Sequence, residues 1–176
     1  TMDVICADCR SSEESRLGGE GQGWKIAMDT INMSRPVIGA QAVGIAQGAL
    51  DFAVRYANER IQFGKPISSF QAIQFMISDM ATGVEAARAL VYKAADMMDE
   101  KTKGTPVQMF SAMSKYFASD VAMRVTTHAV QILQWQGLTK NHPVERMMRD
   151  AKVIQIFEGT NQIQRMVVAH TLLKSK

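Results

Sequence analysis

The chain has 176 residues, of which 47% are hydrophobic and 21% charged, and its formal net charge is +3. This length is sufficient for one domain with a proper core. The 20 basic and 17 acidic side chains are scattered and form no basic run, which argues against a nucleic-acid-binding protein. Aromatic residues make up only 7% of the chain, whereas alanine and methionine are plentiful, and this favours helices over a sheet.

No apolar run reaches the roughly 18 residues of a membrane span, and the polar, acidic N-terminal segment does not resemble a secretory leader. Cys6 and Cys9 form a C-x-x-C pair, but zinc needs a second pair of ligands. The only further candidates are the scattered histidines 128, 142 and 170. We therefore expect no metal site, no membrane span and an intracellular, reducing compartment.

Residues 1–20 do not look like the start of a self-contained fold. Residues 3–6 are typical of a short strand, yet no later segment offers a partner strand. A polar, charged run and a glycine-rich segment follow. We therefore interpret residues 1–20 as a remnant or linker from a preceding β-domain, and residues 21–176 as a helical domain.

From Trp24 the pattern is helical almost to the end of the chain. A first helix is expected over residues 24–33. Ser34 and Pro36 then offer a cap and a first-turn proline, which would restart or kink the helix before a second one over 37–60. Small residues are dense along that second helix. Because each glycine costs about 1 kcal/mol relative to alanine, close helix packing is the expected reason for them.

The remaining pattern predicts a break at 62–69, a long helix capped by Ser69 and extending to about residue 99, and a polar turn at 101–106. Another helix is expected over 107–134, followed by a loop at 137–143, a short helical piece at 144–149 and a last helix beginning near residue 160. The predicted fold is all-α, an antiparallel four-helix-type bundle with a short extended N-terminal segment. The Glu-x-x-His motifs of di-metal bundles are absent from the sequence.

Glu158 lies at the break between the last two helical segments, after Phe157 and before Gly159. Apolar surroundings at such a place can raise the pKa of a carboxylate toward neutrality, as a general base requires. Alternatively, Glu158 only supplies a negative charge near the N-terminus of the next helix, which Thr160 or Asn161 can cap. Its position alone leaves both interpretations open.

Four stretches resemble, in order and spacing, the C-terminal helical domain of the acyl-CoA dehydrogenases. They lie at residues 21–50, 56–71, 143–152 (Pro-Val-Glu-Arg-Met-Met-Arg-Asp-Ala-Lys) and 156–165 (Ile-Phe-Glu-Gly-Thr-Asn-Gln-Ile-Gln-Arg), and they cover essentially the whole chain. The resemblance implies an FAD-dependent oxidoreductase of fatty acid β-oxidation that acts on an acyl-CoA thioester. It also implies an electron-transfer flavoprotein as partner, a homodimer or homotetramer, and a bacterial cytoplasm or mitochondrial matrix.

In this family the glutamate before Gly-Thr is usually the catalytic base. The resemblance therefore assigns to Glu158 the removal of the α-proton, while the β-hydrogen leaves as hydride to N5 of FAD. It implies that the thioester carbonyl accepts hydrogen bonds from a flavin ribityl hydroxyl and from the backbone N–H of the base. The other implied contacts are with FAD for Arg60, Gln62, Phe63, Gln71, Gln131, Thr160 and Gln162, and with acyl-CoA for Asn32, Arg35 and Gly159.

These assignments have alternatives. Arg35 and Arg60 could simply end helices in salt bridges, and Gln71 and Gln131 could be solvated surface residues. Within the same chemistry, an acyl-CoA oxidase or a decarboxylating glutaryl-CoA dehydrogenase would keep the base. A third hypothesis is a non-catalytic helical assembly module with a decayed flavin site.

The sequence departs from the family pattern at two places. Gln134 and Trp135 stand where the family commonly has paired glycines close to the cofactor, and this added bulk would displace the loop, let Trp135 stack, or weaken FAD binding. Phe70 stands where a polar residue often faces the cofactor. The family's N-terminal helical domain and middle β-domain are not represented, so we expect this chain to be inactive on its own.

Overall fold

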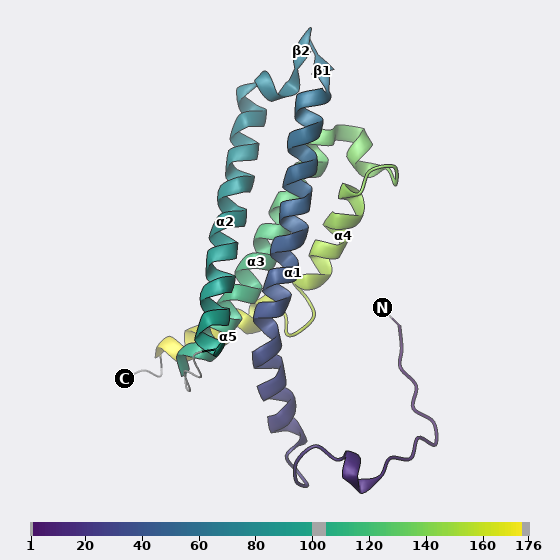
Figure 1. Cartoon of the computed structure of the whole chain (residues 1–176), viewed down its shortest axis with the longest axis vertical. Helices are drawn as coiled ribbons and strands as arrows, with labels where there is room; N and C mark the ends of the chain where they lie inside the picture. The colour runs from purple at the N-terminus through teal and green to yellow at the C-terminus, as the bar shows by residue number, and fades with distance from the viewer. Residues whose placement is uncertain (1, 100–104, 174–176) are drawn as a thin grey trace.

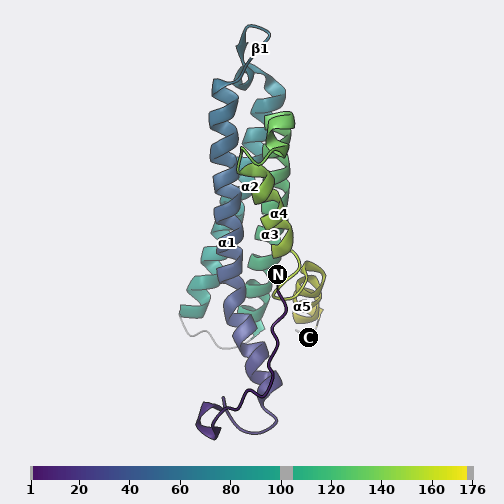
Figure 2. The ribbon, with the colours of Figure 1, turned by 90° about the vertical axis from the view of Figure 1, so that its right-hand side faces the viewer.

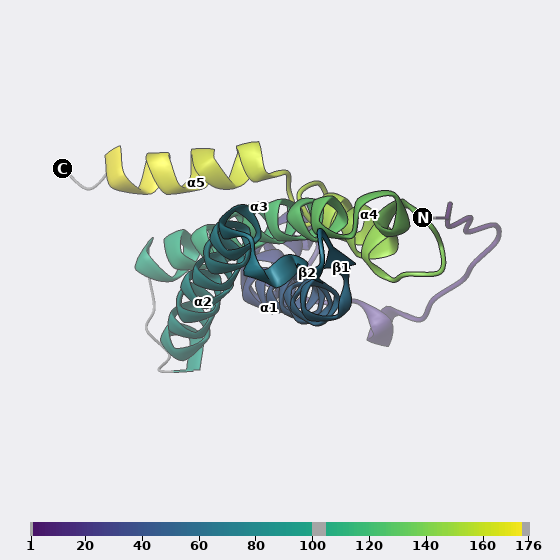
Figure 3. The ribbon, with the colours of Figure 1, turned by 90° about the horizontal axis from the view of Figure 1, so that it is seen from above.

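The computed structural model describes residues 2–99 and 105–173, and helices dominate them (Figure 1). Helices α1 (Gly23–Glu59), α2 (Gln71–Asp99), α3 (Thr105–Leu133) and α4 (Val144–Ile154) alternate in direction. Helix α5 (Asn161–Leu173) crosses one end of this bundle instead of extending it (Figure 2, Figure 3). The predicted all-α, antiparallel four-helix-type bundle is confirmed.

Helix α3 is the centre of the bundle, because α1, α2, α4 and α5 all pack against it. Small side chains along α3 allow these neighbours to approach closely. The fully or almost fully buried ones are Ser111, Ala112, Ser114, Ala118, Ser119, Ala122 and Ala129. Burial on several sides explains why α3 presents no wide polar face.

The expected break at Ser34 and Pro36 is wrong, because α1 continues through Pro36 as one helix of 37 residues. Ser34 does not cap a helix: its hydroxyl oxygen lies 3.1 Å from the carbonyl oxygen of Ile31 and 2.8 Å from Oε2 of Glu158, and its single hydrogen serves one of them at a time. A proline inside a helix removes one backbone hydrogen bond. Pro36 and the neighbouring Arg35 are buried in the bundle, and this packing offsets the lost bond.

An 18-residue window of α1 has a mean hydropathy of 1.4, so by length and composition this helix could cross a membrane. This differs from the sequence-based expectation, which considered uninterrupted apolar runs only. The core helix of a bundle passes the same test. Helix α1 packs its alanine-rich face against α2, α3 and α4, as such a core helix does.

Three other expected boundaries change. Residues 3–6 form no strand and are exposed, since their backbone has no strand to pair with. Ser69 does not cap α2, because its hydroxyl donates to the carbonyl oxygen of Pro66 within the short 3-10 helix η2 (Ile67–Ser69). Helix α4 extends past residue 149 to Ile154, where Ala151 and Ile154 are buried in the core. The polar turn expected at 101–106 lies mainly outside the described residues.

A short hairpin caps the bundle end opposite α5 (Figure 1). Strand β1 (Ile61–Gln62) pairs with β2 (Lys65–Pro66) in antiparallel register. The connecting residues Phe63 and Gly64 both have positive φ, 51° and 76°, which is the pattern of a tight type I′ turn. Residues 2–22 precede α1 at the other end of the bundle and form an exposed segment. This segment contains one short 3-10 helix, η1 (Glu13–Ser15).

Candidate active site

Glu158 lies in the turn that joins α4 to α5. Its φ is +58° and that of Gly159 is +85°, so two consecutive residues adopt the left-handed conformation. For a residue with a Cβ this conformation costs about 1–2 kcal/mol. Surrounding contacts must therefore hold the turn, and they come from α1, α3 and α5.

Helix α1 presents three polar residues to the turn. The Ser34 hydroxyl donates to Oε2 of Glu158, 2.8 Å away. Arg35, only 6% exposed, donates from Nη1 to Oδ1 of Asn32, while its Nε has no hydrogen-bond partner among the described residues. Burial lowers the pKa of Arg35, and the charge of Glu158 acts in the opposite direction. Arg35 is thus a buried cation next to the carboxylate, with an unused donor.

Side chains of α5 and α3 donate hydrogen bonds to the backbone carbonyl groups of the turn. Nε2 of Gln164 donates to the carbonyl oxygens of Glu158 (3.1 Å) and Gly159 (3.0 Å). Nζ of Lys115, on α3, donates to the carbonyl oxygen of Gly159 and to Oδ1 of Asn161, both 2.9 Å away. A Cβ at Gly159 would lie 2.7 Å from Nε2 of Gln164, so glycine is required by both its φ and its surroundings.

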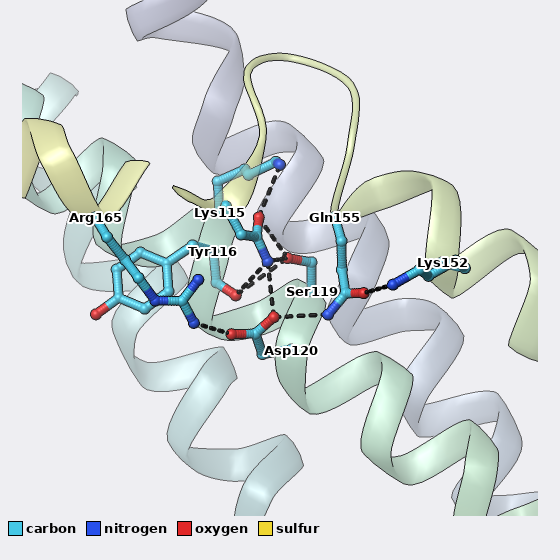
Figure 4. Close-up of polar contacts among 8 residues, drawn as sticks. Lys115, Tyr116, Ser119, Asp120, Lys152, Gln155 and Arg165 are labelled. Atoms are coloured by element: carbon cyan, nitrogen blue, oxygen red, sulfur yellow. Dashed lines mark hydrogen bonds and ion pairs between the residues drawn. The ribbon is translucent and has the colours of Figure 1, made fainter. Parts of the chain in front are cut away.

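Asp120 of α3 anchors both flanks of the turn, through Asn161 on one side and Gln155 on the other. Figure 4 shows Asp120 and Gln155 in this cluster. Nδ2 of Asn161, the first residue of α5, donates to Oδ1 of Asp120 at 2.8 Å. The same Oδ1 accepts from Nε2 of Gln155, just after α4, at 2.7 Å. Arg165 completes the cluster with an ion pair to the other oxygen of Asp120. The end of α4 and the start of α5 are therefore fixed to one carboxylate.

Lys115 is fully buried, which is unusual for a lysine. Its pKa is lowered to about 8, mainly by burial and also by the positive charge of Arg35, although the charges of Asp120 and Glu158 act in the opposite direction. At neutral pH the ammonium group is therefore mostly charged.

A second candidate region lies at the hairpin end of the bundle. Gln62 and Phe63 of the hairpin, Gln131 at the end of α3 and the following Gln134 line one open groove of about 490 Å³. Its apolar lining includes Ile67, Phe70, Ile73, Met76 and Ile132. The Phe63 side chain is 91% exposed, although most large aromatic side chains are at least partly covered. Amide groups and an exposed ring thus border an apolar groove.

The residues predicted to contact FAD fall into two groups. Gln62, Phe63 and Gln131 come together at the groove, and the half-buried Arg60 precedes the hairpin at the end of α1. Gln71 is exposed and does not line the groove, although its neighbours on both sides do. Thr160 and Gln162 lie beside Glu158 at the opposite end, where the Thr160 hydroxyl accepts from the N–H of Ile163. Gln131 follows Lys115 by sixteen positions on α3, about 24 Å at the rise of an α-helix.

Both departures from the family pattern have a structural explanation. Gln134 has a φ of +58°, so the backbone keeps a conformation suited to glycine and the turn begins directly after α3. Trp135 points outward with 67% exposure. The tight contact falls on Gly137 instead, where a Cβ would lie 2.8 Å from the carbonyl oxygen of Val130. Phe70 packs beneath the hairpin, edge-on to Phe63 and under Nζ of Lys65.

Four residues around Glu158 are not assigned a site role from sequence: Ser34, Lys115, Asp120 and Gln164. Ser34 is expected there only as a helix cap. A signal for Lys115 does exist, because it lies within a run of serines and alanines on a helix whose neighbours must approach closely. No three His, Cys, Asp or Glu side chains gather as a metal site among the described residues.

The chain belongs to the acyl-CoA dehydrogenase family: the model of the acyl-CoA dehydrogenase C-terminal domain matches residues 21–173. "Probable acyl-CoA dehydrogenase FadE25" of Mycobacterium tuberculosis is 54% identical over 175 residues, which is 99% of this chain and 44% of that protein. The resemblance seen in the four sequence stretches is confirmed.

Two solved structures show the same fold. A chain in the structure of the electron transferring flavoprotein of Acidaminococcus fermentans has a TM-score of 0.92 and 54% identity, covering 97% of this chain and 44% of that chain. An acyl-CoA dehydrogenase from Bacillus anthracis, solved in complex with FAD, has a TM-score of 0.84 and 32% identity, covering 90% of this chain and 30% of that one. This chain therefore spans less than half the length of these relatives.

Proposed function

We propose that this chain works as the C-terminal domain of an FAD-dependent acyl-CoA dehydrogenase, in which Glu158 is the base that removes the α-proton. One observation carries the proposal: the Glu158 carboxylate is held by Ser34 beside the buried cation Arg35, in a turn whose backbone is strained. Strain of this kind concentrates at functional sites. Because relatives are more than twice as long, the activity is proposed for a protein that also contains the remaining domains.

The residues around Glu158 suit proton removal from a thioester. Such a proton is weakly acidic, so the base must be oriented and the developing oxyanion stabilised. Ser34 holds Oε2 of Glu158 and leaves Oε1 to accept the proton. Among the described residues the backbone N–H of Glu158 has no acceptor, which leaves it available to the thioester carbonyl. Asn32 orients Arg35, whose Nη2 would lie 3.8 Å from a Cβ at Gly159, so the positive charge is next to the region proposed for the thioester.

The proposed reaction is balanced in atoms and electrons. The Cα–H bond breaks, its proton goes to Glu158, and its electron pair forms the Cα–Cβ double bond. The β-hydrogen leaves with the electron pair of its bond. FAD, when bound, supplies the acceptor for this hydride, and we propose an electron-transfer flavoprotein as the next acceptor.

The groove at the hairpin end fits part of FAD. An exposed Phe63 ring can stack on a planar heterocycle, and the amides of Gln62 and Gln131 can pair with its polar edges. The guanidinium of Arg60 suits pyrophosphate oxygens. Since about 24 Å along α3 separate this groove from the Glu158 end, we propose that it holds the adenine end of an FAD whose reactive ring lies in a partner subunit, within a homodimer or homotetramer. Thr160 and Gln162 are the proposed contacts of the FAD at the Glu158 end.

The alternatives share residues with this proposal. An acyl-CoA oxidase or glutaryl-CoA-type dehydrogenase would use the same base, and no side chain described here favours either. Gln134 argues against a non-catalytic assembly module with a decayed flavin site, because its backbone at the groove keeps a glycine-like conformation despite its side chain. A bacterial cytoplasm or mitochondrial matrix remains our prediction for the compartment.

The first prediction tests the base. In the full-length flavoprotein, Glu158→Gln should retain bound flavin but slow flavin bleaching by acyl-CoA by roughly 10²–10⁴-fold, because an amide cannot accept the proton. Stopped-flow absorbance with a panel of acyl-CoA chain lengths measures this rate. Glu145→Gln, which removes the carboxylate that pairs with Arg149 on α4, is the matched control and should react normally. Reduction of the Glu158→Gln protein at the wild-type rate would contradict the proposed function.

A further inference from the structure

The turn that carries Glu158 depends on Lys115. Two consecutive left-handed residues turn the Gly159 carbonyl inward, where it accepts from Nζ of Lys115 at 2.9 Å and from Gln164 at 3.0 Å. The same ammonium group donates to Oδ1 of Asn161 at 2.9 Å. Lys115 thus binds the residue that directly follows the base and the residue that begins α5. Movement of Nζ would release both.

Stability alone does not explain a lysine at this position. Lys115 is 0% exposed, and a buried charge is costly unless it is paired or bound to a metal. Both of its hydrogen-bond partners in the described part of the chain are neutral groups, a carbonyl and an amide. An apolar side chain of similar length would fill the same space without that cost. The charge must therefore serve something other than packing.

The charged groups around Lys115 indicate what it serves. Arg35 faces it from α1, Asp120 belongs to its own helix α3, and Glu158 faces it from the turn. Asp120 is already occupied, since it binds Arg165 and Asn161 of α5 as well as the amide of Gln155. Among the described residues, the Glu158 carboxylate has only the Ser34 hydroxyl as a hydrogen-bond partner. The direction of this carboxylate therefore depends on how firmly its turn is held, and Lys115 holds that turn through the Gly159 carbonyl and Asn161.

We propose that Lys115 is a positioning residue for the base: it fixes the direction of the Glu158 carboxylate through the Gly159 carbonyl and the Asn161 amide. The inference rests on the proposed function of Glu158. Lys115 touches neither substrate nor cofactor in this arrangement and acts only through the turn.

The test is Lys115→Met in the full-length flavoprotein, which removes the donor and the charge but keeps the chain length. Flavin content should stay the same, and the limiting rate of flavin reduction by acyl-CoA should fall about 10–100-fold with a change in KM of less than about threefold. A fall in the limiting rate without a matching change in KM is what a misdirected base produces. Loss of flavin, or a rise in KM as large as the fall in rate, would indicate a purely structural lysine and overturn the positioning role.

Thr126→Val is the matched control. Thr126 is also fully buried on α3, but its hydroxyl bonds only to carbonyl groups of its own helix. This variant should keep the wild-type limiting rate. If its limiting rate falls as that of Lys115→Met does, disturbance of α3 explains both effects and the positioning role is overturned.

Hydrogen exchange of the substrate-free protein provides a readout that does not depend on activity. In Lys115→Met, backbone amides over residues 155–164 should exchange at least about tenfold faster, while those of α1 and α2 stay unchanged. Unchanged exchange in the turn overturns the inference. If the methionine variant fails to fold, Lys115→Gln, which keeps a donor without the charge, takes its place. A folded glutamine variant with the wild-type limiting rate overturns the positioning role of the ammonium group.

The two proposals fail in different ways. If Glu158→Gln keeps normal activity, the proposed function is wrong, whatever Lys115 does. If Glu158→Gln is inactive but Lys115→Met has the wild-type limiting rate and hydrogen exchange, the base is correct and only the positioning role is wrong.

Discussion

Four residues other than glycine have positive φ in the described part of the chain: Asp8, Phe63, Gln134 and Glu158. Three of them belong to the candidate site regions. Phe63 and Gln134 line the groove at the hairpin end, and Glu158 is the proposed base. Residues with a Cβ adopt this conformation at a cost, so such strain persists only where surrounding structure enforces it. The clustering supports a functional origin for both regions.

Gln134 gives a prediction at the residue scale. Gln134→Gly should raise the free energy of unfolding by about 0.5–1 kcal/mol, because relief of the left-handed strain exceeds the added entropy of the unfolded chain. Urea denaturation followed by circular dichroism measures this. Gln136→Gly is the control, since Gln136 lies in the same 3-10 turn (η3, Gln134–Leu138) without a positive φ and should lose stability. Equal losses in both variants would show that Gln134 is not strained.

The sequence identified the candidate base but not what surrounds it. Glu158 stands in a recognisable motif, so it could be predicted from its neighbours in the chain. Ser34 and Lys115 contact the turn from 124 and 44 positions away, and their roles arise only once α1 and α3 pack against it. Lysine is among the residues most often exposed, so a rule based on residue type places Lys115 at the surface.

At the scale of elements, helix positions were predictable and helix ends were less so. Periodic apolar residues predicted all four bundle helices, yet the break at Pro36 and the cap at Ser69 were wrong. In both cases the local sequence pattern predicted a helix end or cap, and the packing of the bundle overrode it. The glycines of α1 also differ in how closely neighbouring helices approach them. A Cβ at Gly39 would lie 3.0 Å from Val91 and 3.2 Å from the carbonyl oxygen of Ser114, whereas Gly44 faces open space.

This difference gives a prediction for one helix. Gly39→Ala should destabilise the protein by about 1–3 kcal/mol, because α1 would be pushed away from the α3 backbone at Ser114. Gly44→Ala should stabilise it by up to about 1 kcal/mol, because alanine favours the helix and meets no neighbour. Thermal unfolding of the two variants measures both. Stabilisation by Gly39→Ala would mean that the helices move apart without cost.

At the scale of the whole molecule, the fold was predictable, whereas the relation between the two site regions was not. Long helices with short connections specify an up-and-down bundle. The sequence also marks Gln131 and Glu158 as candidates for one function. Only the structure shows that Gln131 lies near the end of α3, whereas the Glu158 turn contacts Lys115, about 24 Å away along the same helix. The proposed sharing of one FAD between two subunits depends on assembly, which one chain does not encode as a local pattern.

Burial of a charge at the centre of the bundle also affects the stability of the whole molecule. The pKa of Lys115 is about 8 in the folded protein against 10.5 for an ordinary lysine. Between these values the unfolded chain binds more protons than the folded one, so this group makes folding more favourable as pH rises. Below pH 8 the cost of burying the charge is fully present, and it is relieved progressively up to about pH 10.5.

The free energy of unfolding of the wild type should therefore rise relative to that of Lys115→Met by about 1–3 kcal/mol between about pH 7 and about pH 10. The neutral amine keeps two N–H donors, enough for the Gly159 carbonyl and Asn161, so the turn should stay intact over this range. Urea denaturation of both proteins at each pH measures this difference in the free energy of unfolding. The other titratable groups are the same in both proteins, so their contributions cancel in the difference. For Thr126→Val the difference from wild type should not change with pH. The free energy of unfolding of the wild type minus that of Lys115→Met should increase with pH. If this difference stays constant or falls, water reaches the ammonium group and the lysine is not desolvated by the packing of α3.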